Sequence, residues 1–469
     1  MKLSRILGVY GLKIKEDIEV TKLVTSSFEA SKDTIFLALK GNLYDGNDYI
    51  LDVLEKGCKA VISEKKSIYD YVYKVKNIKK IKNKLTEMIY QNIINTTIFI
   101  GVTGTNGKTT TSNIIYQMLR KDSSINVILV GTNGIFYQDV CKEIDNTTPD
   151  ELVIFNFILD NIENNKKTYV VMEVSSHALS LKRIEHINFD IAIYLNLSHE
   201  HLDYYKTIEN YANAKSILFK KLKNNKIAII NIDDNYAYKM INLENKNIAF
   251  GKTCRENKLI VIDSNLENIK FSLNDCEYQI PLIGNYNAYN ASSAILCLLN
   301  LGYNEEQIKE LLNNIENIPG RMELYRYHHK NVIIDFAHTP QAMKKVLMFL
   351  RTQTSNKIIT LFGCGGNRDK DKRPKMMEIA SLYSDEVYLT SDNPRFEDPL
   401  DIMKDALMGI KNDRVHLYID RRLAIYNAIK SLNKDEYLVI LGKGHEKYQI
   451  VLDTKIKFSD LEEVEKWII

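Results

Sequence analysis

A glycine-rich turn between an apolar segment and a helical one constrains the fold of this chain more than any other feature. The segment TTIFIGV (96–102) is β-branched and apolar, as a buried parallel strand should be. The turn GVTGTNGKT (101–109) follows, and TTTSNIIYQMLR (109–120) then carries apolar residues at helical spacing. Such a turn brings backbone N–H groups and a helix N-terminus together, an arrangement that binds phosphate.

Two side chains of the turn suit a nucleotide. Lys108 adds a positive charge for the β- and γ-phosphates, and the Thr109 hydroxyl can ligate Mg²⁺. Five residues separate Gly101 from Gly107, one more than the strict phosphate-loop pattern has. The alternative is a strand–helix turn with a chance lysine, but the flanking strand and helix favour phosphate binding.

The composition suits a multidomain enzyme. A chain of 469 residues predicts two to four domains, and a net charge of +3 creates no strong field for nucleic acid. No apolar run is long enough to span a bilayer, and the N-terminus lacks a signal-peptide pattern. The six cysteines form no C-x-x-C pair, which argues against a disulfide framework or a structural zinc site. We expect a cytoplasmic monomer that acts on small molecules, without nucleic acid or membrane insertion.

The first part of the chain, residues 1–95, reads as short strands and helices. We expect strands at 34–39 and 60–63 and a helix at 49–55. The Lys-rich stretch at 65–84 predicts a solvated surface helix with its connections.

The rest of the chain predicts two α/β sections. In residues 96–318, the buried-strand runs TYVVMEV, DIAIYLNL and KIAIINI alternate with helical patterns, which predicts a mainly parallel sheet. In residues 319–469, five apolar strands alternate with helices, which predicts a Rossmann-like doubly wound sheet. The fold class we expect is therefore α/β, with a central ATPase section and a C-terminal Rossmann-like section.

Carboxylates and histidines follow two of the central strands. Glu173 ends one strand, and His199, Glu200, His201 and Asp203 follow another. Ligands of open α/β sheets bind at the carboxyl ends of the strands, so these groups suit Mg²⁺ or acid–base work. Zinc stays possible, although the zincin spacing is missing. Glu173 could instead cap a loop, and a loop histidine without any role is an equal alternative for each of the others.

Ten segments in order resemble the Mur ligase family, from near Thr25 to the end of the chain. GTNGKT is followed by EVSSHAL, NLSHEHLDY, YANAKSILF, NYNAYN, IPGRME, DFAHTP, FGCGGNRDKDKRP, SDNPR and GKGHEKYQ. The resemblance implies an N-terminal UDP-sugar domain (1–95), a central ATP-binding domain (96–318) and a C-terminal amino-acid-binding domain (319–469). The chain departs from the family pattern at Ser26-Ser27-Phe28, where Asp-Ser-Arg is usual, and at His199-Glu200, where Arg-Asp is usual.

The resemblance also implies the binding residues. Those for ATP are Gly104, Thr105, Asn106, Gly107, Lys108, Thr109, Thr110, Asn287, Asn290, Arg321 and Asp335, with His338 facing the nucleotide. Those for a UDP-muramyl peptide are Ser27, Asp45, Gly46, Thr147, Thr148, Ser175 and Arg183. Those for a diamino acid are Arg368, Asp392, Asn393, Pro394, Arg395, Gly442 and Glu446.

The catalytic residues that the resemblance implies are Lys108, Glu173, His201 and Lys215. Thr109, Glu173, His201 and Lys215 would hold Mg²⁺, with Lys215 carbamylated to a carboxylate-like ligand. Sequence alone would make Lys215 a surface lysine of a helix.

The implied reaction is ATP-dependent amide-bond formation in peptidoglycan precursor synthesis. ATP would phosphorylate the D-Glu side-chain carboxylate of UDP-N-acetylmuramoyl-L-Ala-D-Glu, and the amine of a diamino acid would displace phosphate. In the family, a DNPR motif accompanies meso-diaminopimelate, because an arginine fork can bind its distal carboxylate. Lanthionine has a similar shape and stays open, as does lysine.

Three other functions fit parts of the pattern. A folylpolyglutamate-type ligase shares the phosphate loop but would not be expected to carry DNPR or GKGHE. A non-catalytic nucleotide-binding protein would be expected to lose Lys108, Glu173 or Lys215, and all three are present. A mechanical ATPase or nucleic-acid motor is disfavoured by the near-neutral charge.

Overall fold

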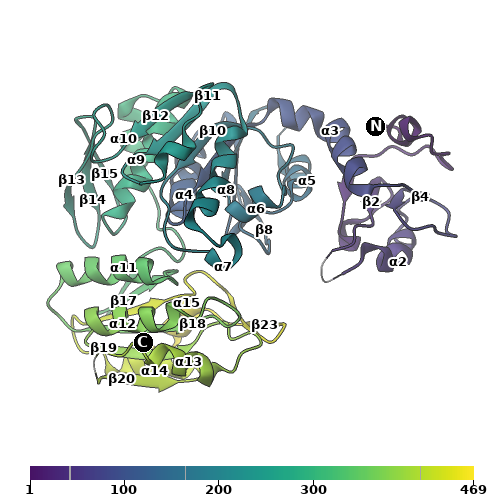
Figure 1. The fold of residues 1–469 in the computed structure, drawn as a ribbon. Helices are drawn as coiled ribbons and strands as arrows, with labels where there is room; N and C mark the ends of the chain where they lie inside the picture. The colour runs from purple at the N-terminus through teal and green to yellow at the C-terminus, as the bar shows by residue number, and fades with distance from the viewer. Residues whose placement is uncertain (42–43, 164, 412, 469) are drawn as a thin grey trace. The chain divides into compact units, whose positions relative to one another are not determined.

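The computed structural model describes residues 1–41, 44–163, 165–411 and 413–468 (Figure 1). The side chains of Val9 and Asp203 lie outside that description, so the expectation for Asp203 is not addressed. The chain forms two compact units, each described by itself. The first comprises Met1–Gly101, Asp122–Ile191 and Lys220–Lys226, and the second Val102–Lys121, Ala192–Phe219 and Ile227–Ile469.

A four-stranded parallel sheet, in the order β1-β2-β3-β4, forms the N-terminal part of the first unit. Its elements are α1 (Leu3–Leu7), η1 (Gly8–Tyr10), β1 (Lys22–Val24), η2 (Ser27–Glu29), β2 (Thr34–Leu37), η3 (Gly46–Tyr49), α2 (Ile50–Glu55), β3 (Val61–Ser63), β4 (Val72–Lys74) and α3 (Ile78–Thr96). The expected strands and helix are present within two residues of their predicted ends.

The Lys-rich stretch at 65–84 differs from the prediction of a surface helix with its connections. It contains the strand β4, and the helix α3 begins only at Ile78. The strand has three residues, which is too short for an alternating pattern to be recognised. The helix turns Ile81, Leu85 and Tyr90 inward, so it is not a solvated element on all sides.

The rest of the first unit contains the strands of the central section. They pair in the order β10-β5-β9-β6-β7-β8, with β6 and β9 parallel and β6-β7-β8 antiparallel. The elements are β5 (Ile98–Thr103), β6 (Ile125–Gly131), β7 (Gly134–Tyr137), β8 (Val140–Lys142), α5 (Glu151–Asn161), β9 (Lys167–Glu173), α6 (Ser176–Ser180) and β10 (Phe189–Tyr194). The carboxyl ends of β5 and β10 continue into the second unit.

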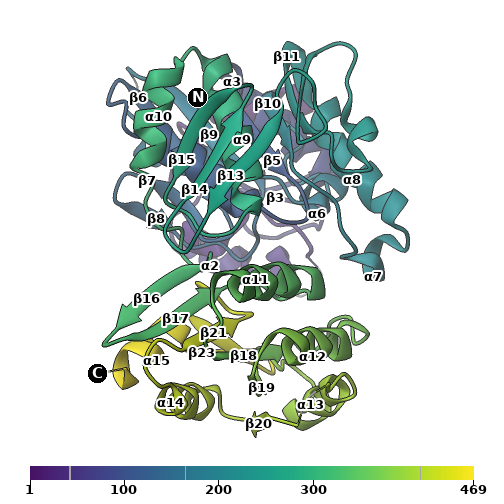
Figure 2. The same ribbon diagram turned by 90° about the vertical axis from the view of Figure 1, so that its left-hand side faces the viewer.

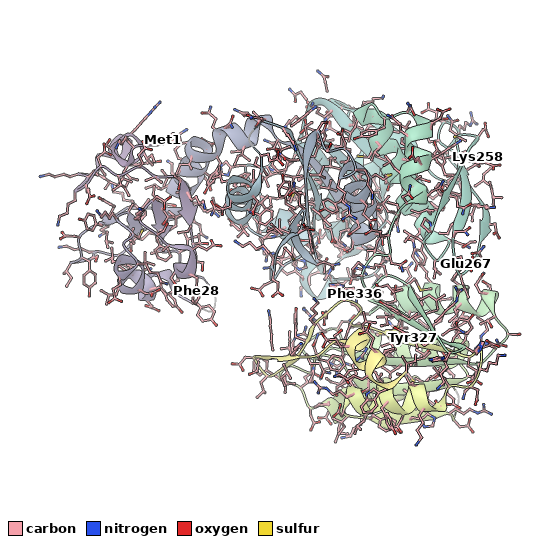
Figure 3. All side chains as sticks on the ribbon, turned by 180° about the vertical axis from the view of Figure 1, so that it is seen from behind. Met1, Phe28, Lys258, Glu267, Tyr327 and Phe336 are labelled. Carbon is pink, nitrogen blue, oxygen red and sulfur yellow. The ribbon has the colours of Figure 1, made fainter. Side chains whose placement is uncertain are left out.

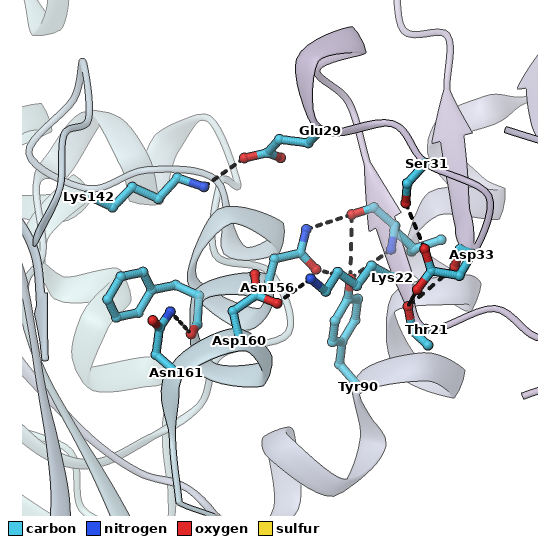
Figure 4. Close-up of polar contacts among 12 residues, drawn as sticks. Thr21, Lys22, Glu29, Ser31, Asp33, Tyr90, Lys142, Asn156, Asp160 and Asn161 are labelled. Carbon is cyan, nitrogen blue, oxygen red and sulfur yellow. Dashed lines mark hydrogen bonds and ion pairs between the residues drawn. The ribbon is translucent and has the colours of Figure 1, made fainter. Parts of the chain in front are cut away.

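A buried polar network joins α3, α5 and β1 within the first unit (Figure 4). The Tyr90 hydroxyl donates to Asn156 Oδ1 at 2.5 Å, and Asn156 Nδ2 donates to the Leu23 carbonyl at 2.9 Å. The Leu23 N–H donates back to the Tyr90 oxygen at 2.8 Å. Burial raises the pKa of Tyr90, so the phenol stays protonated and keeps its donor. This closed network fixes the N-terminal sheet against α5 more firmly than surface ion pairs could.

The second unit begins at Val102 and includes the helix that follows the glycine-rich turn, while β11 crosses into it from the first unit at Ile227. Its elements before residue 319 are α4 (Lys108–Leu119), α7 (Leu202–Tyr205), α8 (Ile208–Lys220), β11 (Leu222–Asn231), η4 (Ala237–Met240), β12 (Lys246–Phe250), β13 (Leu259–Ser264), β14 (Ile269–Leu273), β15 (Cys276–Ile280), α9 (Tyr286–Leu301) and α10 (Glu305–Asn313). The strands β11 and β12 are parallel, whereas β13-β14-β15 form an antiparallel sheet that the sequence did not predict. Helix α9 packs against both α4 and this small sheet.

The C-terminal section is a six-stranded sheet in the order β16-β17-β21-β18-β19-β20. All neighbours are parallel except the edge strand β16, which is antiparallel to β17. The elements are β16 (Glu323–Tyr327), β17 (Lys330–Asp335), α11 (Pro340–Gln353), β18 (Ile358–Cys364), α12 (Lys372–Tyr383), β19 (Glu386–Ser391), α13 (Pro399–Leu407), β20 (Val415–Tyr418), α14 (Arg421–Ser431), β21 (Tyr437–Leu441), β22 (Tyr448–Val451), β23 (Thr454–Lys457) and α15 (Asp460–Trp467).

Helices cover both faces of this sheet (Figure 2). Ile333 packs with α11, α12 and α13 on one face, whereas its neighbours Val332 and Ile334 pack with α14 and α15 on the other. The predicted α/β class with mainly parallel, doubly wound sheets is confirmed. The antiparallel edge β16 and the hairpin β22–β23 are additions. Among the described residues, no helix is both long enough and apolar enough to cross a membrane.

Candidate active site

The glycine-rich turn is built around a helix N-terminus in the second unit. Gly107 has φ +90°, which favours glycine, and a Cβ there would lie 2.4 Å from Asn290 Oδ1. The N–H groups of Thr105 and Asn106 donate to the backbone carbonyl and side chain of Asn196, at 2.8 and 2.9 Å. The loop is therefore held in shape before any nucleotide binds, with the first turn of α4 beside it.

Two lysines share one carbonyl oxygen of this loop. Lys108 Nζ and Lys215 Nζ each lie 2.9 Å from the Gly104 carbonyl, and Lys108 also reaches the Thr105 carbonyl at 3.0 Å. Lys215 is 1% exposed, and its amine lies 4.4 Å from the centre of the Tyr211 ring. The expectation of a surface lysine is therefore wrong.

The environment of Lys215 favours the uncharged amine. Burial lowers its pKa well below the usual lysine value, and the neighbouring Lys108 lowers it further, against the opposing effect of Glu200. An uncharged amine keeps its lone pair and can act as a nucleophile, whereas a charged ammonium could only form ion pairs and donate hydrogen bonds.

Glu200 and two histidines lie near the loop. His338 Nε2 is 3.5 Å from Glu200 Oε1, and His201 Nε2 is 4.0 Å from Glu200 Oε2. Burial alone would raise the pKa of Glu200, but His338, His201 and Lys108 outweigh it and lower that pKa to about 2. Glu200 is thus ionised at neutral pH. The chain has His199-Glu200 where Arg-Asp is usual in the family, so a carboxylate is retained at the second position.

The start of the C-terminal section contributes a cation to the loop. Arg321 Nη2 donates to Thr109 Oγ1 at 2.9 Å, and its guanidinium carbon lies 4.9 Å from the centre of the Phe336 ring. Asp335 accepts the N–H groups of Met322 and Ala337. Burial raises the pKa of Asp335, with Arg321 opposing. The structure thus brings Lys108, Thr109, Arg321 and Asp335 into one region.

Asn287 and Asn290 lie on the buried face of α9. Asn290 Nδ2 donates to Asn287 Oδ1 at 2.7 Å, and Asn287 Nδ2 donates to the Ile283 carbonyl at 2.8 Å. Their expected contact with the nucleotide stays a prediction, although Asn290 already lies against Gly107.

A second cluster surrounds Glu173 in the first unit. The backbone N–H and hydroxyl of Thr132 donate to the two Glu173 carboxylate oxygens at 2.8 and 3.1 Å, and the same hydroxyl lies 3.2 Å from Thr147 Oγ1. Thr148 Oγ1 donates to the Glu173 carbonyl at 2.8 Å and accepts the Ser175 N–H. Threonine donors therefore fix the position of the Glu173 carboxylate.

Arg183 extends this second cluster. Its Nη1 donates to the Thr148 carbonyl at 3.3 Å. The structure therefore gathers the expected residues Thr147, Thr148, Ser175 and Arg183 around Glu173. The sequence missed Thr132, whose place directly after the strand β6 is the signal that could have indicated it.

Gly131 leaves the space that the Glu173 carboxylate occupies. A Cβ at Gly131 would lie 2.2 Å from Glu173 Oε1. We expect Gly131→Ala to lower the free energy of unfolding by about 1–3 kcal/mol, measured by urea denaturation, because the carboxylate must leave its donors. Gly8→Ala is the matched control, since no atom lies within 4 Å of its Cβ position. Equal stability of the two variants would contradict the close packing at Gly131.

The N-terminal sheet carries the residues expected at the uridine end. Asp45 caps the short helix η3 and pairs with Lys65 at 2.8 Å, whereas a Cβ at Gly46 would lie 2.8 Å from the Leu39 carbonyl oxygen. Ser27 is buried beside Phe28, whose ring is 90% exposed and lies at the tip of this part (Figure 3). These residues share one region of the N-terminal sheet, but their role stays a prediction.

The residues expected to bind a diamino acid gather at the carboxyl ends of β18, β19 and β21. Asn393 Nδ2 donates to Glu446 Oε2 at 3.0 Å. Arg395 Nη1 donates to the Gly366 carbonyl at 2.9 Å, and a Cβ at Gly365 would lie 3.1 Å from that nitrogen and 3.7 Å from Arg368 Cγ. Burial lowers the pKa of Arg395, and the positive charge of Arg368 lowers it further.

The remaining residues expected to bind the diamino acid are Asp392, Pro394 and Gly442, which contact other parts of the protein. A Cβ at Gly442, where φ is +110°, would lie 2.8 Å from Asp392 Oδ2. The Pro394 carbonyl accepts the Glu397 N–H. The sequence missed Lys443, which is 0% exposed and 2.7 Å from Glu446 Oε2. Its place inside GKGHE, next to expected site residues, is the only signal for it.

No preformed cage for a metal exists among the residues that the structure describes. In that part of the chain, no group of three or more His, Cys, Asp or Glu side chains is placed to hold a metal ion.

Known proteins resemble this chain in sequence and in fold. A family model described as the Mur ligase middle domain matches residues 102–298, and one described as the Mur ligase glutamate ligase domain matches residues 320–444. The UDP-N-acetylmuramoyl-L-alanyl-D-glutamate–2,6-diaminopimelate ligase 1 of Clostridium acetobutylicum is 37% identical over 489 aligned residues, covering 100% of this chain and 99% of that protein.

Solved structures give the same result. One of a UDP-N-acetylmuramoyl-L-alanyl-D-glutamate–2,6-diaminopimelate ligase superposes with a TM-score of 0.65 at 29% identity, over 100% of this chain and 98% of that one. The MurF ligase of Thermotoga maritima in complex with ADP superposes with a TM-score of 0.73 at 20% identity, over 96% and 97%, which shows a shared fold. With both models matched and full-length relatives above 30% identity, the chain belongs to the Mur ligase family.

Proposed function

We propose that this chain is the ATP-dependent ligase that adds meso-diaminopimelate to the D-Glu side-chain carboxylate of UDP-N-acetylmuramoyl-L-Ala-D-Glu. The reaction forms one amide bond and releases ADP and phosphate. The observation that carries the choice of amino acid is the cluster of Arg368, Arg395 and Glu446 at the strand ends of the C-terminal sheet. The relatives named as diaminopimelate ligases support the same choice.

The chain's own residues can stabilise phosphoryl transfer. Lys108 on the phosphate loop and Arg321 beside Thr109 supply two positive charges where the γ-phosphate would lie. The carboxylate would attack that phosphate to give an acyl phosphate, and the incoming amine would then expel phosphate from a tetrahedral intermediate. No side chain needs to act as a covalent nucleophile.

We propose that Thr109, Glu173, His201 and carbamylated Lys215 hold Mg²⁺. When bound, Mg²⁺ neutralises developing negative charge on the phosphates. The hydroxyl oxygen of Thr109 and the carboxylate oxygens of Glu173 are of the kind that Mg²⁺ prefers as ligands.

The depressed pKa of Lys215 supports its carbamylation. Only an uncharged amine can attack CO₂, and burial together with Lys108 favours that form. The product is a carboxylate in place of an amine, with one proton released. A carboxylate would then face Lys108 where two lysines otherwise compete for the Gly104 carbonyl.

We also propose the assignment of three domains at 1–95, 96–318 and 319–469 to the UDP-sugar, ATP and amino acid. Ser27, Asp45 and Gly46 would serve the uridine end, and the cluster around Glu173 the muramyl dipeptide. Asn287, Asn290 and Asp335 would contact the adenosine. We also place the reaction in the cytoplasm and expect the protein to be a monomer.

Phosphate release by the purified protein tests the function. With ATP, Mg²⁺ and UDP-N-acetylmuramoyl-L-Ala-D-Glu present, we expect turnover with meso-diaminopimelate and at least about 100-fold lower kcat/KM with L-lysine, because lysine leaves the two arginines without a partner. Lanthionine, which has a similar shape, tests whether the site distinguishes it from meso-diaminopimelate. Preference for lysine would contradict the assignment of the diamino-acid residues. No phosphate release with any of the amines would contradict the proposed reaction.

A further inference from the structure

The residues proposed to bind the UDP-muramyl peptide all belong to the first unit. They are Ser27, Asp45 and Gly46 at the uridine end, and Thr147, Thr148, Ser175 and Arg183 at the dipeptide end. The residues proposed to bind ATP and the diamino acid all belong to the second unit. One substrate would therefore be held at both of its ends within a single unit, so the spacing of its two subsites is determined inside that unit.

Helix α5 carries the dipeptide end. The segment with Thr147 and Thr148 leads directly into this helix, and the Asp150 side chain caps its first turn. The Glu151 N–H at the start of the helix donates to the Arg183 carbonyl at 2.9 Å. Both sides of the dipeptide cluster are thus joined to the N-terminal end of α5, and a shift of α5 would move them.

The strand β1 carries the uridine end. Ser27 lies in the short helix η2, which closely follows β1. Leu23 of β1 pairs with Ile35 of the neighbouring strand β2, and the Gly46 N–H donates to the Leu39 carbonyl just beyond β2, at 2.8 Å. A shift of β1 would therefore move the whole uridine end.

Leu23, Tyr90 and Asn156 join β1 to α5 through the closed hydrogen-bond network (Figure 4). The three residues are 0%, 1% and 4% exposed. Both backbone polar groups of Leu23, the Tyr90 hydroxyl and both polar atoms of the Asn156 amide bond within the network. If β1 shifted against α5, several of these buried groups would lose their partners, at a larger cost than the loss of an exposed hydrogen bond. The network therefore opposes any change in the distance between the two subsites.

Two ion pairs cross the same junction, one near each end of α5. Lys82 of α3 pairs with Asp150 at 2.6 Å, and Lys22 of β1 pairs with Asp160. All four side chains are partly exposed, and exposed ion pairs contribute little to stability. The buried network is therefore the stronger constraint on how β1 lies against α5.

We propose that Tyr90 and Asn156 are positioning residues for the UDP-muramyl peptide, because they fix the spacing between its uridine and dipeptide subsites. A ligand whose two ends bind together is held much more tightly than either end alone, provided that the subsites match its length. A fixed spacing preserves this gain, since little conformational freedom is lost when the ligand binds. The inference rests on the proposed function, because it concerns the substrate assigned to the first unit.

Tyr90→Phe tests the inference by removing one hydroxyl group. The ring can keep its packing against Phe155, whose ring centre is 5.1 Å away. The Leu23 N–H and Asn156 Oδ1 lose their partner, so the spacing of the subsites becomes variable. We expect the Kd of UDP-N-acetylmuramoyl-L-Ala-D-Glu, measured by titration calorimetry on the full chain, to rise on the order of tenfold or more. The Kd values of UDP and of N-acetylmuramoyl-L-Ala-D-Glu, each measured alone, should stay within about twofold.

Tyr137→Phe is the matched control. The Tyr137 hydroxyl also donates a buried hydrogen bond to an asparagine, Asn126, at 2.9 Å, but this bond joins β7 to β6. Its loss should leave all three Kd values unchanged. Asn156→Leu should repeat the effect of Tyr90→Phe, and the double variant should bind little more weakly than either single variant, because each substitution disrupts the same network.

Steady-state kinetics separates positioning from a general loss of structure. In Tyr90→Phe, KM for the UDP-muramyl peptide should rise, while KM for ATP and kcat at saturating substrates stay within about twofold of wild type. Equal weakening of UDP alone and of the whole ligand would overturn the proposal, since the network would then only support the N-terminal sheet. An unchanged Kd for the whole ligand would overturn it as well. Failure of the proposed function is a different result, because wild-type protein would then bind UDP-N-acetylmuramoyl-L-Ala-D-Glu no more tightly than UDP.

Discussion

Lys215→Met should lower kcat on the order of 10³-fold while leaving the fold intact. Methionine fills nearly the same volume against Tyr211 but cannot become a carbamate, so a proposed metal ligand is lost. Several kcal/mol of transition-state stabilisation would be missing, and each 1.36 kcal/mol is tenfold in rate. Rates of phosphate release at saturating substrates measure the effect, and circular dichroism verifies folding.

A matched control lies on the same helix. Lys220 is exposed at the end of α8, and Lys220→Met should keep the wild-type kcat. Wild-type protein in CO₂-depleted buffer should lose activity and regain it with bicarbonate, and ¹³C-bicarbonate should give a carbamate signal that Lys215→Met lacks. If Lys215→Met retained more than about a tenth of wild-type kcat, the carbamate would not be a metal ligand.

Arg395→Ala should raise KM for meso-diaminopimelate at least about 30-fold, because the distal carboxylate loses a guanidinium partner in a partly buried site. KM for ATP should stay within about twofold, since Arg395 lies at the diamino-acid cluster and Lys108 and Arg321 serve the phosphates. Steady-state kinetics with each substrate varied in turn measures both values.

Two further variants sharpen this result. Arg395→Lys keeps the charge without the planar fork and should recover only part of the loss. Arg326, a surface residue 3.8 Å from Glu267, provides the control Arg326→Ala, which should change neither KM. A parallel rise in KM for ATP and diaminopimelate would mean that Arg395 supports the fold of the domain rather than the ligand.

Most of the buried parallel strands were predicted, because they need only a run of apolar residues, although β6 was not among them. β5, β9, β10, β18 and β21 are all of this kind. The sheet β13-β14-β15, the strand β4 and the hairpin β22–β23 were not, because their strands are short or half exposed and most of them carry Lys, Glu or Gln. Such strands depend on tertiary partners, which the sequence does not display.

The candidate site also contains residues that could be predicted from the sequence and residues that could not. The phosphate loop and Glu173 follow from strand ends alone, whereas Lys215 required the fold to be seen. A signal existed, because Tyr211, Lys215 and Leu218 share one face of α8 at helical spacing, so the lysine stands in an apolar stripe. Lys443 gave no such signal, because it lies in an irregular segment where periodicity does not apply.

The hydrogen bonds of Lys108 to the Gly104 and Thr105 carbonyls bear on which ligands the loop can hold. Any anion must draw the ammonium away from two neutral acceptors before it gains that contact. A polyphosphate chain carries enough negative charge to attract the Lys108 ammonium more strongly than the two carbonyl oxygens do. A singly charged anion attracts it little more strongly than they do. The loop should therefore bind only highly charged ligands such as polyphosphates. Abundant small anions would then not occupy it between turnovers.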